Sequence, residues 1–343
     1  MAAGRQLVLV TGGSGYIGVN IIIKLLEQGY RVRTTLRTMS RQDEVRQMLV
    51  RGGVADPERL EFVEADLTDD ANWDQAAMGA AYVIHVASPT PVTRPRDGEA
   101  MVAMAVDGVR RVMAAAVKAH AKRVVLTSAS GAVIAGHKEH PDLFTEEDWT
   151  DLSANIDAYQ RSKTMAEKAA WEMAADTGIQ LATVNPVAVM GPILGPDFSH
   201  SNRSITAMLS GGMPWLLRIG FDYVDVRDVA DLHLAAMTNP DAAGERFIAT
   251  SGENLTYRQV AMILKERLGY SARRVSTTEI PDWLVRLFAA VNPALRMPAS
   301  FLGQNTACSG DKARRILGWS PRPAEEAIVA TATSLIKLGI VKR

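Results

Sequence analysis

The sequence has few of the residues that build disulfides and metal sites. It contains one cysteine, Cys308, which can form neither a disulfide within the chain nor a thiolate metal cluster. Its six histidines are scattered and show no His-Glu-x-x-His pattern, so we expect no metal site.

The sequence also lacks net charge and long apolar runs. Its 38 Lys and Arg residues balance 38 Asp and Glu residues, so nothing favours nucleic acid or an anionic membrane as a partner. The longest apolar stretches, 181–194 and 328–341, contain polar residues or proline and fall short of the ~20 apolar residues that span a membrane. Residues 1–7 show no secretory signal. We therefore expect a globular protein of the cytoplasm.

Short apolar runs alternate with helical patterns over roughly the first 180 residues. We predict strands at 6–11, 32–36, 61–65, 82–86, 123–127 and 180–184, with helices at 15–29, 42–49, 72–78, 101–121 and 158–175. This alternation predicts an α/β fold, a Rossmann-type doubly wound parallel sheet.

The pattern changes after residue 186. Residues 186–222 are rich in proline, glycine and serine, and helices are predicted at 257–269, 311–317 and 324–338. We predict a dinucleotide-binding Rossmann domain of residues 1–186 and 222–250. Residues 187–221 and 251–343 would form a smaller C-terminal substrate-binding domain.

A glycine-rich turn joins the first predicted strand to the first predicted helix. It consists of Thr11, Gly12, Gly13, Ser14, Gly15, Tyr16, Ile17 and Gly18. Glycines at this junction let the backbone approach a pyrophosphate at the helix N-terminus, so the turn predicts a dinucleotide site. The alternative is an ordinary glycine turn.

The second predicted strand ends without the acid that would bind the ribose 2′-OH of NAD. Arg33, Arg37 and Arg41 are the basic residues of this segment, and the first acid is Asp43. Because a guanidinium binds phosphate well, we assign Arg37 to the 2′-phosphate and predict NADP(H) as cofactor. The alternative is a solvated surface arginine.

Tyr159 and Lys163 lie four residues apart, on one face of a predicted helix. A nearby ammonium favours phenolate, so we expect Lys163 to lower the pKa of Tyr159 and make it a general acid. Thr127 and Ser128 end the fifth predicted strand, where side chains face the ligand crevice. We predict that Ser128 holds a carbonyl oxygen. Ser130 is the alternative, because strand alternation puts it on the same face.

These motifs together resemble the extended short-chain dehydrogenase/reductase superfamily, and more finely its dihydroflavonol-reductase-like branch of aldehyde and ketone (carbonyl) reductases. Further segments similar to that branch are Leu36-Arg37, Ala65-Asp66-Leu67, residues 85–89, residues 166–171, Val184-Asn185-Pro186 and residues 224–230. The resemblance covers nearly the whole chain.

The resemblance implies roles for several further residues. Asp66 and Leu67 would contact the adenine end of the cofactor, and Thr127 would lie on the cofactor side of the crevice. Val86, Ala87 and Ser88 would line the ribose and phosphates. Lys163 would bind the nicotinamide ribose and Pro186 would face the carboxamide. Alternatively, Asp66 caps a helix and Pro186 ends a strand. We expect Asp225, Arg227 and Asp228 to form structural ion pairs.

The sequence departs from its relatives at two positions that bear on chemistry. Ala129 stands where many relatives have their catalytic serine, and the segment 105–109 lacks an asparagine that relatives often carry. The region before Tyr159 also lacks the Asn-Trp-Tyr-Cys pattern of cinnamoyl-CoA reductases. Trp215, Leu216 and Leu217 are candidates for an apolar lid over the substrate, or for packing of the small domain.

The resemblance therefore implies an NADPH-dependent carbonyl reductase for aldehydes or ketones with apolar or aromatic substituents, in which Tyr159 donates the proton. The protein would be a monomer or homodimer. Three alternatives remain: a 3β-hydroxysteroid dehydrogenase, a sugar-nucleotide epimerase or dehydratase, and a non-catalytic NADP-sensing protein.

Overall fold

A seven-stranded parallel sheet forms the centre of the larger part of the molecule, with the strand order β3-β2-β1-β4-β5-β6-β9. The computed structural model describes residues 6–89, 98–137, 141–196, 199–292, 299 and 301–341. The strands are β1 (Leu7–Thr11), β2 (Arg31–Leu36), β3 (Leu60–Glu64), β4 (Ala80–His85), β5 (Arg123–Thr127), β6 (Gln180–Pro186) and β9 (Arg246–Ala249). Every residue of β1 and β5 is buried, because helices cover both faces of the sheet.

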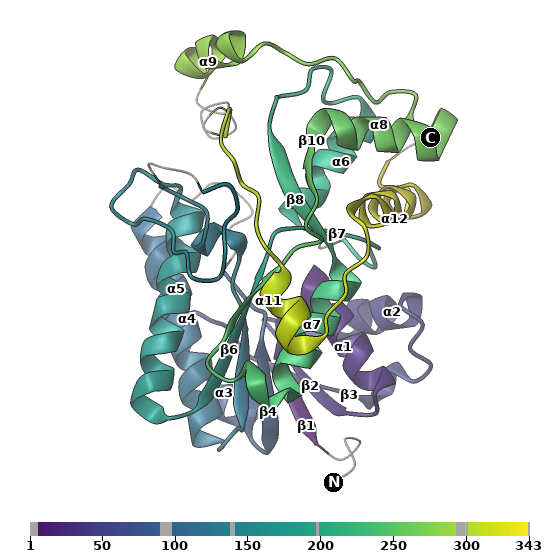
Figure 1. Ribbon diagram of the computed structural model, residues 1–343. Helices are drawn as coiled ribbons and strands as arrows, with labels where there is room; N and C mark the ends of the chain where they lie inside the picture. The colour runs from purple at the N-terminus through teal and green to yellow at the C-terminus, as the bar shows by residue number, and fades with distance from the viewer. Residues whose placement is uncertain are drawn as a thin grey trace.

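Two helical layers cover the sheet, one on each face (Figure 1). One layer contains α1 (Tyr16–Glu27), α2 (Gln42–Arg51) and α7 (Val226–Thr238), and the other contains α3 (Trp73–Ala77), α4 (Gly98–Lys118) and α5 (Ala158–Thr177). The two faces of the sheet contribute to separate hydrophobic clusters. The predicted α/β fold of Rossmann type is therefore confirmed.

A small second sheet stands beyond the carboxyl end of the large one, in the upper part of Figure 1. Its central strand β8 (Gly220–Asp225) pairs in parallel with β7 (Ala188–Met190) and antiparallel with β10 (Asn254–Thr256). The helices α6 (His200–Ser210), α8 (Tyr257–Leu268), α9 (Asp282–Val291) and α12 (Ala324–Lys337) lie in this part of the molecule. The short helix α11 (Asp311–Leu317) instead contacts β9 and α7 of the larger part.

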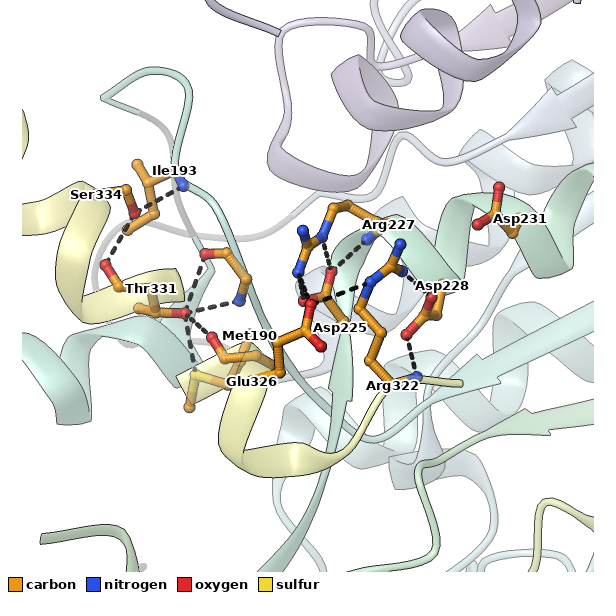
Figure 2. Close-up of polar contacts among 12 residues, drawn as sticks. Met190, Ile193, Asp225, Arg227, Asp228, Asp231, Arg322, Glu326, Thr331 and Ser334 are labelled. Carbon is orange, nitrogen blue, oxygen red and sulfur yellow. Dashed lines mark hydrogen bonds and ion pairs between the residues drawn. The ribbon is translucent and has the colours of Figure 1, made fainter. Parts of the chain in front are cut away.

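Polar side chains fasten α12 to the junction between the two sheets, as Figure 2 shows. Thr331 accepts the Gly191 N–H at 2.7 Å, and Ser334 accepts the Ile193 N–H at 2.9 Å. Nearby, an ion-pair cluster joins the start of α7 to α12 and the chain before it, through Asp225, Arg227, Asp228, Arg322 and Glu326. The prediction that Asp225, Arg227 and Asp228 make structural ion pairs is confirmed.

The predicted strands and helices agree with the observed ones to within a few residues at each end. The sequence did not indicate α6 within the Pro/Gly-rich segment, nor the strands β7 to β10 and α7. The division into two domains stays a prediction. In the part of the chain described by the structure, no helix has the length and apolar character needed to cross a bilayer. The same residues contain no group of three or more potential His, Cys, Asp or Glu metal ligands.

Candidate active site

A cavity lies at the carboxyl ends of β4 and β5, between these strands and the helices α4 and α5. Six of the residues that line it carry predicted roles, namely Leu67, Ala87, Ser88, Thr127, Ser128 and Lys163. Two further polar residues on its wall, His85 and Glu167, were not singled out by the sequence analysis. The fold thus brings predicted cofactor-binding and catalytic residues from distant segments to one place.

The glycine-rich turn packs so tightly that no side chain fits at three of its glycines, Gly12, Gly13 and Gly18. A Cβ on Gly12, whose φ is +73°, would lie 2.9 Å from the Ala87 Cα atom. A Cβ on Gly13 would lie 2.1 Å from Thr34 Oγ1, and one on Gly18 would lie 2.4 Å from the Gly12 carbonyl oxygen. The bare backbone therefore leads directly into the N-terminus of α1, which is the geometry that a pyrophosphate needs. This turn fits a dinucleotide.

The outer residues of the turn have structural partners. Tyr16 is buried, and Ile17 packs against the same hydrophobic cluster. Ser14 accepts a hydrogen bond from Arg41 at 3.1 Å. Thr11 fixes the loop after β4, because its hydroxyl oxygen accepts the N–H groups of Val86 at 3.1 Å and Ala87 at 3.0 Å.

The three arginines considered for the 2′-phosphate differ in their surroundings. Arg33 is bound to Glu61 at 2.8 Å and to three backbone carbonyls, so it serves the sheet edge. Arg41 pairs with Glu44. Arg37 is exposed directly after β2, and its charge helps to lower the pKa of Asp66. Arg37 is therefore close enough to Asp66 for their charges to interact.

Asp66 and Leu67 also have local roles. Asp66 Oδ1 accepts the Thr68 N–H and hydroxyl, both at 2.8 Å, and the Thr68 N–H is the main cause of its lowered pKa. Asp66 therefore stabilises the turn after β3, and the alternative that it caps a helix is wrong, because the next helix, α3, begins at Trp73 after Asn72. Leu67 packs closely against Gly108 of α4, where a Cβ would lie 3.0 Å from the Leu67 Cβ.

The helix α5 carries the predicted proton-transfer pair, and its first turn is firmly fixed. Asp157 is the N-cap, where its carboxylate accepts the Tyr159 N–H at 2.8 Å, and Gln160 completes a capping box. The Lys163 ammonium lies 6.0 Å from the centroid of the Tyr159 ring. The two side chains thus share one face of the helix, as predicted.

The pKa values of this pair are shifted by burial. Desolvation raises the pKa of Tyr159 to about 12, and the Asp157 charge adds to this rise. Desolvation lowers the pKa of Lys163 to about 8, against the opposing effect of Glu167. The expected lowering of the Tyr159 pKa by Lys163 is not found: desolvation of the phenolate is the main cause of the shift, and the ammonium lies 6.0 Å from the ring centroid.

A buried polar network lies behind Ser128. The Ser128 hydroxyl donates to Glu167 at 2.6 Å, and the same carboxylate accepts from Thr183 and Asn185 at 3.1 and 2.8 Å. Arg246 of β9 forms an ion pair with Glu167 at 2.7 Å. Glu167 is completely buried, so Ser128 is held at the base of the cavity by an ionised core residue.

Other predicted residues have contacts that limit their roles. Thr127 donates its hydroxyl to His233 Nε2 at 2.7 Å, because His233 Nδ1 donates to the Val229 carbonyl. Burial lowers the pKa of His233 to about 4, so this imidazole is neutral. Pro186 ends β6 and is buried. Leu216 is fully buried, so it packs the protein and does not form a lid, whereas Trp215 is exposed.

Sequence signals existed for both residues that were missed. Glu167 follows Lys163 by four positions, so Tyr159, Lys163 and Glu167 repeat along one helical face. His85 is the last residue of β4, at the strand end where ligands bind. The sequence position of neither residue predicts its burial or its hydrogen-bond partners, because both depend on the tertiary fold.

Comparison with known proteins adds independent information on ancestry. A model of the NAD dependent epimerase/dehydratase family matches residues 8–249. The chain is 37% identical to cinnamoyl-CoA reductase 1 from Arabidopsis thaliana over 253 residues, covering 73% of this chain and 72% of that protein. It is 31% identical to dihydroflavonol 4-reductase from Zea mays over 274 residues, covering 78% and 75%.

Solved structures share the fold over nearly the full length. The yeast methylglyoxal/isovaleraldehyde reductase Gre2, complexed with NADPH, has a TM-score of 0.80 at 25% identity and covers 98% of this chain and 100% of its own. The UDP-glucose 4-epimerase of Thermotoga maritima has a TM-score of 0.72 at 21% identity, covering 97% and 99%. Reductases and an epimerase therefore share this architecture, and the fold alone does not choose between them.

Proposed function

Since this chain belongs to the NAD dependent epimerase/dehydratase family, as an NADP(H)-dependent oxidoreductase of the extended short-chain dehydrogenase/reductase type, we propose that it reduces aldehydes or ketones with apolar or aromatic substituents to alcohols. The reaction is reversible. Two observations support this proposal: Tyr159 and Lys163 share one face of α5, and Lys163 lines the cavity together with Ala87, Ser88 and Ser128.

The cofactor, when bound, supplies the hydride, and the chain supplies binding, orientation and a proton. The glycine turn would hold the pyrophosphate and Arg37 the 2′-phosphate. Lys163 would orient the nicotinamide ribose, as the resemblance to the family implies. With a pKa near 8 it is still mostly an ammonium at neutral pH, so its charge favours oxyanions at the site.

Tyr159 is the proton donor of this proposal. A pKa raised to about 12 keeps the phenol protonated at neutral pH, which is the state a donor needs. An alkoxide is a stronger base than phenolate, so the proton moves from Tyr159 to the reduced substrate. Ser128 is retained as the residue that contacts the carbonyl oxygen, ahead of Ser130. To donate to that oxygen, however, its hydroxyl must turn away from Glu167.

The proposed substrate class is supported by the names of the relatives. The reductases named above are a cinnamoyl-CoA reductase, a dihydroflavonol reductase and an aldehyde reductase. The substrates in these names all contain a carbonyl group, and two of them contain an aromatic ring. The missing Asn-Trp-Tyr-Cys pattern disfavours a cinnamoyl-CoA thioester. We also retain the predictions of a cytoplasmic enzyme that is a monomer or homodimer, on the basis of its balanced charge and sequence.

The test is the loss of reduced-nicotinamide absorbance with NADPH or NADH, across a panel of aromatic aldehydes, ketoesters, ketones and a 3β-hydroxysteroid. Tyr159→Phe should reduce kcat by at least ~100-fold, the typical contribution of a general acid. Tyr270→Phe is the matched control, because Tyr270 is 77% exposed on the surface.

Two outcomes would contradict the proposal. Turnover that survives in Tyr159→Phe would remove the assigned donor. Tight NADPH binding with no turnover of any carbonyl would favour the NADP-sensing protein, unless UDP-sugars are converted, in which case the epimerase alternative holds.

A further inference from the structure

His85 has a defined tautomer that follows from the valence of its partner. Thr11 Oγ1 accepts N–H bonds from Val86 and Ala87 at 3.1 and 3.0 Å, which occupy both of its lone pairs. The Thr11 hydroxyl also lies 2.8 Å from His85 Nδ1. Only its own proton remains for this contact, so Thr11 donates and Nδ1 is an unprotonated acceptor.

The imidazole is neutral, which places its single proton on Nε2. Burial and the nearby Lys163 charge lower the pKa of His85 to about 3. A neutral ring carries one N–H, and Nδ1 is already an acceptor. His85 is therefore an Nε2–H donor at any pH above its pKa.

This donor is buried and has no hydrogen-bond partner among the described residues. His85 is 1% exposed, and it lines the cavity together with Lys163, Ser128 and Glu167. A buried N–H without an acceptor costs ~1–3 kcal/mol, so such groups usually face a ligand or an ordered water. The orphaned atom thus indicates a binding position inside the cavity.

The charges around the cavity decide which acceptor fits. Lys163 from α5 provides an ammonium, Glu167 from α5 provides a carboxylate paired with Arg246 of β9, and no other titratable side chain lines the cavity in the part described. The carboxylate disfavours a second anion. Ser128 gives its proton to Glu167 and so presents lone pairs. A hydroxyl group suits all three neighbours, because it can accept from His85 and Lys163 and donate to Ser128.

We propose that His85 Nε2–H is a cofactor-binding donor, which bonds a hydroxyl oxygen in this cavity, either a ribose hydroxyl of NADPH or a water molecule that bridges to it. This inference depends on the family's dinucleotide cofactor and not on the proposed carbonyl substrate. It adds a residue to the site that has no charge of its own and that binds NADPH and NADH equally, since both carry the same ribose hydroxyls.

Two substitutions separate binding from structural support. In His85→Asn the amide oxygen can still accept the Thr11 hydroxyl, but the donor at the Nε2 position is lost. In His85→Gln the amide nitrogen can occupy the Nε2 position, while the contact with Thr11 is lost. We expect His85→Asn to weaken NADPH and NADH binding about tenfold, the effect of one hydrogen bond, and His85→Gln to remain within about threefold. Cofactor fluorescence measures both constants, and the thermal midpoint checks the fold.

The matched control is Arg37→Ala, which should weaken NADPH but not NADH. The reverse ranking of the two His85 variants, with Asn equal to wild type and Gln weakened, would show a purely structural role and overturn the proposal. So would a ¹⁵N NMR spectrum with the proton on Nδ1. A crystal structure of the NADPH complex distinguishes the two sources, because either a ribose oxygen or a water lies within hydrogen-bonding distance of Nε2. A carbon atom there, or no atom, contradicts the inference. If NADPH binds as expected but no carbonyl is reduced, only the proposed function fails.

Discussion

Glu167 is a buried residue whose removal should disturb several contacts at once. Its carboxylate accepts from Ser128, Thr183 and Asn185, and it forms the ion pair with Arg246. Both partners of the ion pair are almost completely buried, with side-chain exposures of 0% and 9%. Glu167→Ala would leave the guanidinium without its counter-charge and the Ser128 hydroxyl without its acceptor, while Thr183 and Asn185 would each keep one weaker acceptor.

The expected loss of stability follows from the burial of this pair. Removing one partner of a buried ion pair costs about 3–5 kcal/mol, because the remaining charge stays desolvated. The stacking of Arg246 on Trp149, with 3.7 Å between the guanidinium carbon and the ring centroid, keeps that charge in place. With an unfolding entropy of ~2.1 cal/mol/K per residue over 343 residues, a loss of about 4 kcal/mol lowers the midpoint by about 6 °C.

Differential scanning calorimetry and urea unfolding measure this change. Glu167→Gln keeps the shape and one acceptor but also leaves the guanidinium without a counter-charge, so it should still cost about 3 kcal/mol. Glu172→Ala, an exposed glutamate on the same helix, should change the unfolding free energy by less than ~0.5 kcal/mol. In a double-mutant cycle with Arg246→Met, the coupling energy should be about 2–3 kcal/mol. Additive effects, or a midpoint within about 1 °C of wild type for Glu167→Ala, would refute the reasoning.

Two further predictions concern pH and the glycine turn. Between the unfolded pKa of 6.5 and the folded pKa of about 4, the unfolded chain binds a proton at His233 that the folded protein excludes. The unfolding free energy therefore decreases as the pH is lowered through this range. His233→Gln should reduce the acid-side slope of the unfolding free energy by about 1.4 kcal/mol per pH unit, and an unchanged slope between these values would show that His233 is not buried as a neutral ring. Gly13→Ala would place a Cβ 2.1 Å from Thr34 Oγ1 and 2.8 Å from Ile22 Cδ1. This substitution should lower the unfolding free energy by about 1–3 kcal/mol and weaken NADPH binding. The control for both measurements is Gly212→Ala, where the nearest atom lies at an ordinary 3.5 Å. Equal NADPH affinities in these two glycine variants would contradict the close approach of the turn.

The fold was predictable where local patterns repeat and less so where packing decides. The apolar runs of β1 and β5 are buried on both faces, so their sequences carry a strong strand signal. The strand β7 has three residues, and α6 lies within the Pro/Gly-rich segment 186–222. Their pairing with β8 and packing against α12 stabilise them, and no window of local sequence contains those partners.

The site was predictable in its motifs but not in its electrostatics. The glycine turn, Tyr159 and Lys163 were identified from spacing, and the fold brings Lys163 to the cavity that the cofactor loop also lines. The sign of the Tyr159 pKa shift was wrong, because burial of a phenolate cannot be seen in a spacing of four residues. Glu167 and His85 were missed for the same reason, since their importance comes from partners far away in the sequence.

Ser128 shows how this buried network bears on the chemistry. A hydroxyl that stabilises a carbonyl oxygen must donate its only proton to it, and Ser128 gives that proton to a charged acceptor, Glu167, at 2.6 Å. The substrate must therefore compete with a carboxylate for this bond. We expect Ser128→Ala to lower kcat/KM by less than about tenfold, smaller than the ~100-fold effect of Tyr159→Phe.

The same substitution removes a donor from Glu167, so the unfolding free energy should also fall by about 1–2 kcal/mol. Ser130→Ala is the comparison, because Ser130 was the alternative for the carbonyl contact; it begins the short 3₁₀ helix Ser130–Ala132 that follows β5. If Ser130→Ala alone caused the larger loss of kcat/KM, the carbonyl contact would pass to Ser130 and leave Ser128 as a residue of the buried network. If Ser128→Ala reduced kcat/KM as strongly as Tyr159→Phe, the hydroxyl must leave Glu167 during turnover, and the carboxylate would then need a new donor in the substrate complex.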